Sequence, residues 1–164
     1  MHWYPLIKLL HILAVIVAVG GLFARQLLRR YAHRASDIHV LSEFSNAAGQ
    51  VERFMVIPGM NAVFVIGAVL ALVGGMPIFG FLQGASQNWL LVSNLLLVST
   101  GVLVPTVFLP RGRKYAPILD AALAKGEITP ALRVAMGDRV VRLAHWYEET
   151  SVIAIAALMV LKPF

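Results

Sequence analysis

The sequence has no cysteine, and it has no charged side chain between Phe54 and Pro110. Without cysteine, disulfides, thiolate metal sites and covalent haem attachment through C-x-x-C-H are excluded. A membrane-spanning helix needs about 20 mostly apolar residues. A charge-free stretch as long as 54–110 can therefore cross a bilayer twice, which no soluble core requires.

Charged residues are scarce in the whole chain, at 13%, while apolar residues reach 59%. Soluble domains are roughly a quarter charged. The N-terminal apolar segment lacks a basic start and a small-x-small cleavage site, so it predicts a retained helix rather than a signal peptide. We expect one all-α membrane domain (1–164), an antiparallel up-down four-helix transmembrane bundle. The expected spans are about 4–23, 54–73, 89–109 and 143–161.

The net charge is +6, and the basic residues are concentrated in two segments of the chain. Of the 14 Lys and Arg residues, five lie in 25–53 and seven in 111–142, and none lies in 74–88. Positive residues concentrate in cytoplasmic loops. This pattern predicts that both basic segments are cytoplasmic and both termini lie outside. The partner of the basic residues is then the bilayer surface, and no nucleic acid is expected.

The segments between the spans carry helix signals of their own. The polar stretch 36–53 predicts a short surface helix with Ser36 as its N-cap. In the second basic segment, Thr129-Pro130 predicts a helix start, and a basic helix follows it into the last span. Small residues such as Gly59 and Gly67 are suited to close helix contact in lipid.

Lys8 and His11 share one face of the first helix at i, i+3 spacing. His11 is expected roughly 10 Å below the outer surface, where ionisable groups are costly and are functional candidates. It could ligate a b-type haem iron or relay protons. Alternatively, it hydrogen-bonds a neighbouring helix while Lys8 extends to the headgroups. Asn94 lies at the same expected level and is the predicted partner, whereas His145 is expected roughly 15 Å away.

Glu148 and Glu149 are expected just inside the inner boundary of the last span. A lone buried carboxylate would protonate, so at least one of them should meet a cation from another helix. Arg25 and Arg53 are the predicted counter-ions. The pair could form part of a proton path or a substrate site, or it could be a salt-bridge cluster that fixes helix packing.

The first helix, with Lys8-x-x-His11, then Gly20-Gly21 and a basic exit at Arg25, resembles the opening of a family of small bacterial membrane proteins. The last helix, which begins His145-Trp-Tyr-Glu-Glu and ends Lys-Pro-Phe, resembles the same family. Its branches are the DUF2269 predicted integral membrane proteins and the HemJ-type protoporphyrinogen oxidases, with copper-resistance D-like domains as wider relatives. The resemblance implies the bacterial cytoplasmic (inner) membrane.

One departure from the HemJ-type pattern bears on activity. That pattern has a Lys shortly after a Trp-Leu pair at the start of the third helix, whereas this sequence has Ser93 and Asn94 after Trp89-Leu90. Three functions remain open. They are a b-haem-binding or accessory subunit of a homo-oligomer or larger membrane complex, a porphyrin oxidoreductase, and a transport helper for a metal or small solute. The last is weakest, because no broken-helix pair or internal repeat is present.

Overall fold

The computed structural model describes residues 3–163, and every regular element in that range is helical. The α-helices are α1 (Trp3–Arg34), α2 (Ile38–Val51), α3 (Ile57–Val73), α4 (Trp89–Leu103), α5 (Leu109–Lys125), α6 (Pro130–Met136) and α7 (Arg139–Leu161). Two π-helical turns, η1 (Glu52–Val56) and η3 (Val104–Phe108), and a 3₁₀ turn, η2 (Gly80–Gln83), complete the chain.

Two of the helices are much longer than the expected spans. The elements α2, η1 and α3 form one helix of 36 residues, and α4, η3 and α5 form one of 37. At 1.5 Å per residue each is about 55 Å long, well beyond the roughly 30 Å of a bilayer core. The prediction of a separate surface helix over 36–53 is therefore wrong. That segment continues directly into α3, and its N-cap is Asp37 rather than Ser36.

Two prolines within these long helices, Pro58 and Pro105, lie at π-helical turns. Pro58 is the second residue after η1, and Pro105 lies inside η3. The N–H of Ile57 donates to Glu52 O, and the N–H of Leu109 donates to Val104 O, each five residues back. Proline has no N–H for the α-helical ladder, and the wider turn lets both helices run on past it.

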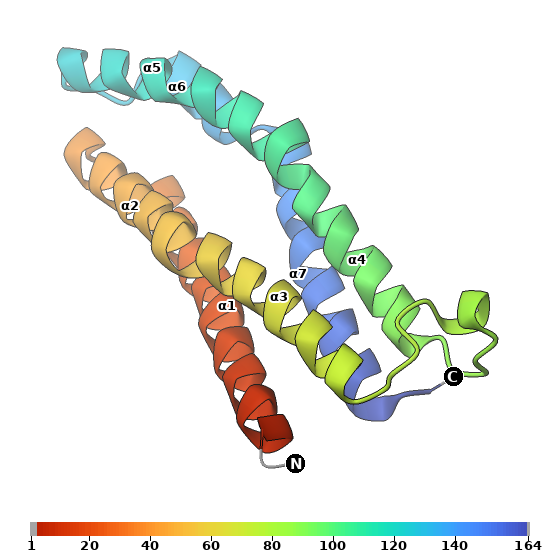
Figure 1. The fold of residues 1–164 in the computed structure, drawn as a ribbon. Helices are drawn as coiled ribbons and strands as arrows, with labels where there is room; N and C mark the ends of the chain where they lie inside the picture. The colour runs from red at the N-terminus through yellow and green to blue at the C-terminus, as the bar shows by residue number, and fades with distance from the viewer. Residues whose placement is uncertain (1–2, 164) are drawn as a thin grey trace.

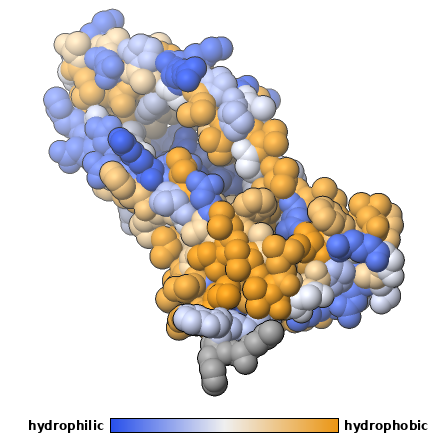
Figure 2. Space-filling view, viewed as in Figure 1, coloured by the Kyte–Doolittle hydropathy of each residue, from blue (hydrophilic) through white to orange (hydrophobic). Residues whose placement is uncertain are grey.

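The chain forms two helix pairs that lie side by side (Figure 1). Helix α1 packs along α2 and α3, while α4 packs along α7. Both termini lie at one end of the molecule, called here the terminal end, and α2, α5 and α6 lie at the other, called the basic end (Figure 1). Figure 2 shows hydrophilic residues gathered toward the basic end and hydrophobic ones nearer the terminal end.

Within the described residues, three helices are long and apolar enough to span a membrane: Trp3–Arg34, Ile38–Val73 and Trp89–Lys125. Helix α7 is not among them, because its first half carries His145, Glu148 and Glu149. The all-helical membrane fold is thus confirmed, while a fourth crossing by α7 stays a prediction.

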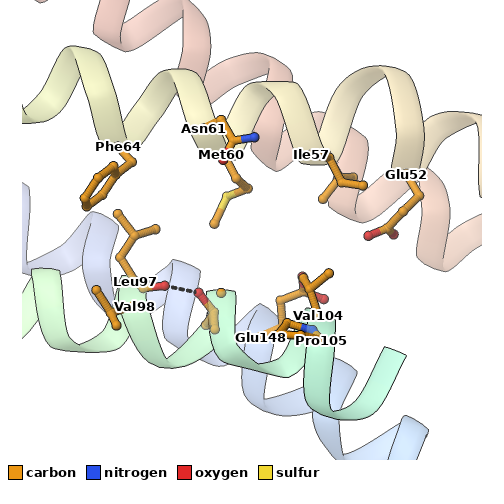
Figure 3. A pocket seen from close by; sticks show the side chains of 13 residues that line it. Glu52, Ile57, Met60, Asn61, Phe64, Leu97, Val98, Val104, Pro105 and Glu148 are labelled. Atoms are coloured by element: carbon orange, nitrogen blue, oxygen red, sulfur yellow. Dashed lines mark hydrogen bonds between the residues drawn. The ribbon is translucent and has the colours of Figure 1, made fainter. Parts of the chain in front are cut away.

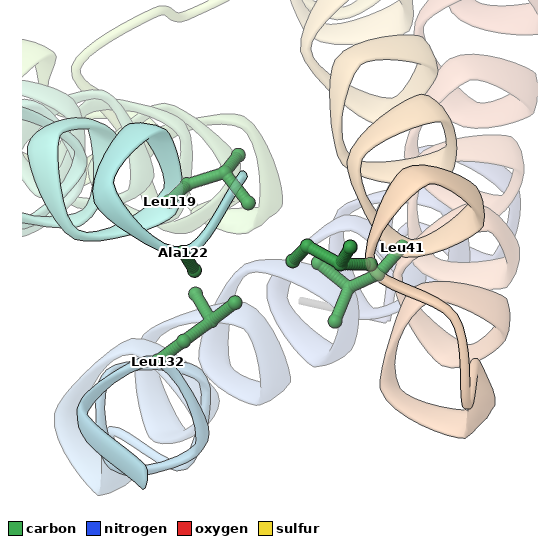
Figure 4. Packing of buried hydrophobic residues seen from close by; sticks show 5 residues of the cluster. Leu41, Leu119, Ala122 and Leu132 are labelled. Carbon is green, nitrogen blue, oxygen red and sulfur yellow. The ribbon is translucent and has the colours of Figure 1, made fainter. Parts of the chain in front are cut away.

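Apolar clusters join the two helix pairs at both ends. At the basic end, Leu41 of α2 meets Leu119 and Ala122 of α5 and Leu132 of α6 (Figure 4). Thr129 caps α6 with its side chain, as the sequence predicted. The helix does not continue into the last span, because α6 ends at Met136 and α7 begins at Arg139. At the terminal end, residues of α3 and α4 form a second cluster, made of Ala71, Trp89 and Leu90.

Candidate functional site

A line of close contacts runs between α1 and α3. A Cβ added to Gly59 would lie 3.0 Å from Ala18 backbone atoms, and one added to Gly67 would lie 2.9 Å from His11 Cε1. Glycine at these positions lets the helices approach, as expected from the sequence. His11 and Ala18 are seven residues apart on α1, and Arg25 follows at the same spacing. The contact line therefore leads from the apolar middle of the pair to an arginine.

Arg25 connects three elements at the basic end of the contact line. Its side chain is buried, with only 1% of the residue exposed. Nη1 donates to Glu52 of η1, and Nη2 donates to Glu148 of α7. Glu148 is itself 4% exposed. The ion pair expected between the last helix and Arg25 is present, and Glu52 is a second partner that the sequence did not predict.

His145 lies beside this ion pair on α7. Its ring stacks on Phe108 of η3, with centroids 4.5 Å apart and planes 17° apart. Arg29 Nη1 lies 2.5 Å from His145 Nε2, and His145 Nδ1 lies 3.1 Å from Arg25 Nη2 and 3.4 Å from Glu148 Oε2. An arginine can only donate, so Nε2 accepts from Arg29, while Nδ1 faces both an arginine donor and a carboxylate acceptor. The ring is thereby held between the two arginines and Glu148.

Arg25, Arg29, Glu52, His145 and Glu148 form the ion cluster. Two arginines and two glutamates cancel in formal charge, so the cluster can be buried without a net charge. Removing one partner from such a cluster leaves an uncompensated buried charge, whereas the intact cluster contributes little net stability. Its effect is to fix α1, η1 and α7 in one arrangement.

A cleft of about 390 Å³ adjoins the ion cluster and lies between α3 and α4 (Figure 3). Met60 and Phe64 line it from α3, and Leu97 and Val98 line it from α4. At one end it is lined by carboxylate residues from η1 and α7, Glu52 and Glu148. Its volume lies within the range of small-molecule sites, about 300–1,000 Å³.

His11 lies against α3 rather than against α4. Within the described residues its Nδ1 is buried without a hydrogen-bond partner, so the predicted bond to Asn94 is not formed. Lys8 is exposed on the surface of α1. His11 borders neither the cleft nor a second cavity at α5 and α6. Haem ligation by His11 stays a prediction.

The other polar residues singled out in the sequence are less constrained. Glu149 is half-buried, and its Oε1 has no partner in the described part of the chain. Arg53 lies over the Phe54 ring at 5.6 Å instead of pairing with a carboxylate of α7. Across residues 3–163, no group of three or more His, Asp or Glu side chains could hold a metal ion.

Comparison with known proteins places the chain by its sequence. The model of the predicted integral membrane proteins named DUF2269 matches residues 5–163, almost the whole chain. The chain belongs to the DUF2269 family. No curated protein and no solved structure was found to match.

Part of the ion cluster of this DUF2269 protein was not predicted from its sequence. The depth comparison sets His145 apart from His11 and predicts no partner for it, and Glu52 falls in the segment 36–53, where a surface helix is expected. A usable signal was present, because the seven-residue spacing that places His11 and Ala18 against α3 also places Arg25 there. Moving seven residues along each antiparallel helix from the contact of Ala18 with Gly59 pairs Arg25 with Glu52.

Proposed function

We propose that this membrane protein binds a lipid-soluble small molecule in the cleft between α3 and α4, with the polar end of the molecule at Glu52 and Glu148. The observation that carries the proposal is the lining of the cleft. Its walls along α3 and α4 are mostly apolar, with Asn61 and Thr100 as polar exceptions, and one end is ionisable. Ligand sites combine mostly apolar walls with a few placed polar groups in this way.

The surroundings of the cleft support entry from the bilayer. Phe64 and Val98 face each other across it and are 51% and 55% exposed. The two helix pairs are joined mainly by the apolar clusters and the ion cluster, which leaves the space between α3 and α4 unfilled. A molecule dissolved among acyl chains reaches this space sideways, without crossing the polar basic end.

A tetrapyrrole is one class of occupant implied by the resemblance to HemJ-type oxidases. The cleft supports that possibility better than His11 does, because His11 lines neither the cleft nor the cavity at α5 and α6. Porphyrin oxidation is therefore retained as a second candidate, tested by complementation of a bacterial strain that lacks protoporphyrinogen oxidase. The positive-inside pattern supports a cytoplasmic basic end in a bacterial inner membrane.

Filling the cleft tests the proposal. A Cβ added to Gly101, which lines the cleft, meets no atom within 4 Å, and the same holds for Gly20 on the exposed surface of α1. Gly101→Phe should block the cleft, while Gly20→Phe is the matched control. Mass spectrometry of organic extracts should find a small molecule besides phospholipid, in near-stoichiometric amount, with wild type and Gly20→Phe but not with Gly101→Phe.

Circular dichroism and gel filtration check that all three proteins are folded to the same extent. Extracts that contain phospholipid alone, or the same molecule in equal amounts from Gly101→Phe, would contradict binding in the cleft.

A further inference from the structure

We infer that the cleft is selective for an amphiphile whose head group is a cationic hydrogen-bond donor, such as an amine, over one with a carboxylate head. The inference rests on the proposed function and specifies its ligand class. It follows from which part of the ion cluster faces the cleft and from the hydrogen-bonding groups still available there.

The cleft meets only the acidic side of the ion cluster. Glu52 and Glu148 line it, whereas Arg25 does not. Arg25 lies behind the two carboxylates, 1% exposed, and each of its terminal nitrogens is bonded to one of them. A head group that enters the cleft therefore meets carboxylates before it meets any cation of the cluster.

Both carboxylates retain accepting capacity. Each bonds Arg25 through Oε2, and within the described residues the Oε1 atoms of Glu52 and Glu148 form no hydrogen bond. An ionised carboxylate has about four lone-pair sites and no donor. The inner end of the cleft thus offers two oxygens that can accept a charge-assisted bond, which is roughly twice as strong as a neutral one.

Donors are scarce along the same walls. The hydroxyl of Thr100 already donates to Leu97 O at 2.7 Å, the dashed contact in Figure 3. Pro105, beside the carboxylates, has no N–H. The amide of Asn61 is available, but it lies nine residues from Glu52, about 13 Å along the helix. An anionic head at the inner end would find no donor and two like charges.

Charge repulsion makes this difference selective. A carboxylate head at this end would lie beside two groups of its own sign, and like charges at such short range repel, an effect that the pairing of both glutamates with Arg25 reduces. Discrimination between ligands often comes from such unfavourable contacts with the wrong one. An ammonium in the same place would be attracted by both carboxylates and could donate to both Oε1 atoms.

Matched photoreactive amphiphiles test the inference on the full chain in lipid nanodiscs. The probes are a long-chain alkylamine, the fatty acid and the alcohol of the same length, each with a mid-chain diazirine. Mass spectrometry then maps labelling at Phe64 and Val98 in the cleft and at Val65 and Leu95 on the lipid-facing surface. The amine should label the cleft positions saturably and with at least about tenfold higher affinity than the acid or alcohol, as expected for a charge-assisted bond.

Variants distinguish the head-group preference from ligand binding in the cleft itself. Glu52→Gln should remove most of the amine preference, whereas Glu43→Gln, an exposed change on α2, should not alter it. Equal or stronger cleft labelling by the acid or alcohol would overturn the head-group inference and leave the proposed function standing. Amine preference that survives both Glu52→Gln and Glu148→Gln would do the same. Cleft labelling that Gly101→Phe does not reduce for any probe would overturn the proposed function itself.

Discussion

Replacing Arg25 by methionine should strongly destabilise the protein. The substitution keeps much of the side-chain volume but removes the cation between Glu52 and Glu148. Glu148 is 4% exposed and would remain as an unpaired buried charge. Breaking a buried pair in this way costs about 3–5 kcal/mol. The side chain of Glu52 is 27% exposed, so its half of the cluster should contribute only about 0–1 kcal/mol.

Because Glu148 is more deeply buried than Glu52, their replacement should restore different amounts of the stability lost in Arg25→Met. Arg25→Met combined with Glu148→Gln leaves no unpaired buried charge on α7, so the double variant should regain most of the lost free energy of unfolding. Arg25→Met combined with Glu52→Gln should regain much less. The two double-mutant cycles isolate these couplings, because residues in direct contact give non-additive effects.

The free energy of unfolding can be measured by SDS titration in detergent micelles, followed by far-ultraviolet circular dichroism. Arg30→Met is the matched control, because Arg30 is exposed on the same helix. An ordinary surface change alters the free energy of unfolding by less than about 0.5 kcal/mol. A change that small for Arg25→Met would refute the reasoning. Strict additivity of Arg25→Met and Glu148→Gln would also refute it.

Four further predictions address other parts of the molecule. Gly67→Ala should cost about 1–3 kcal/mol by overpacking, since its Cβ would lie 2.9 Å from His11 Cε1. His11→Ala should relieve that cost, and Gly20→Ala should show none if the cost is steric. Backbone N–H bonds, from Val40 first and then His39, lower the pKa of Asp37. The stabilisation of the α2 start is therefore complete above the unfolded pKa, about 3.9, and is lost as the pH falls through the lower folded pKa. Amide exchange at Val40 should accelerate below that pH in wild type but not in Asp37→Asn. Reporter fusions after Ser86 should behave as external and those after Lys125 as cytoplasmic, because 12 of the 14 Lys and Arg residues lie in 25–53 and 111–142; the reverse pattern would invert the topology. Finally, His11→Ala should leave the absorption spectrum of the purified protein unchanged, and a Soret band lost only in that variant would establish His11 as a haem ligand.

Three of the expected spans lie in helices apolar enough to cross a membrane, and they were predictable because lipid demands long apolar segments. Their ends were not, because the criterion for crossing lipid says nothing of where a helix stops. Nothing between Phe23 and Arg34 breaks a helix, and α1 runs to Arg34. Similarly, 38–56 lacks proline, so α2 continues into α3 as one helix. The polar composition of 38–51 predicted a helix, which is present, but not that this helix continues into α3.

The sequence predicted the contact that the cost of burying a charge requires, but not the contacts that depend on which helices are neighbours. Burial of Glu148 requires a cation, and Arg25 was the predicted candidate. The pairing of His11 with Asn94 was inferred from matching depth, but α1 packs along α3 rather than α4. Depth orders residues along the membrane normal and leaves open which helices are neighbours. The π-helical turn that carries Glu52 also changes the face on which later residues lie, and no local pattern predicted it.

The seven-residue spacing of His11, Ala18 and Arg25 has a consequence for the shape of the α1–α3 pair. A straight α-helix drifts by about 20° per heptad from a strict seven-residue repeat. Helices that keep such a repeat in contact wind around each other with a left-handed supercoil. One residue inserted between Ala18 and Arg25 would rotate the arginine by about 100°, away from both glutamates, while His11 and Ala18 stayed in register with α3. The seven-residue spacing thus sets the direction in which the Arg25 side chain points from α1, and through it the position of α7.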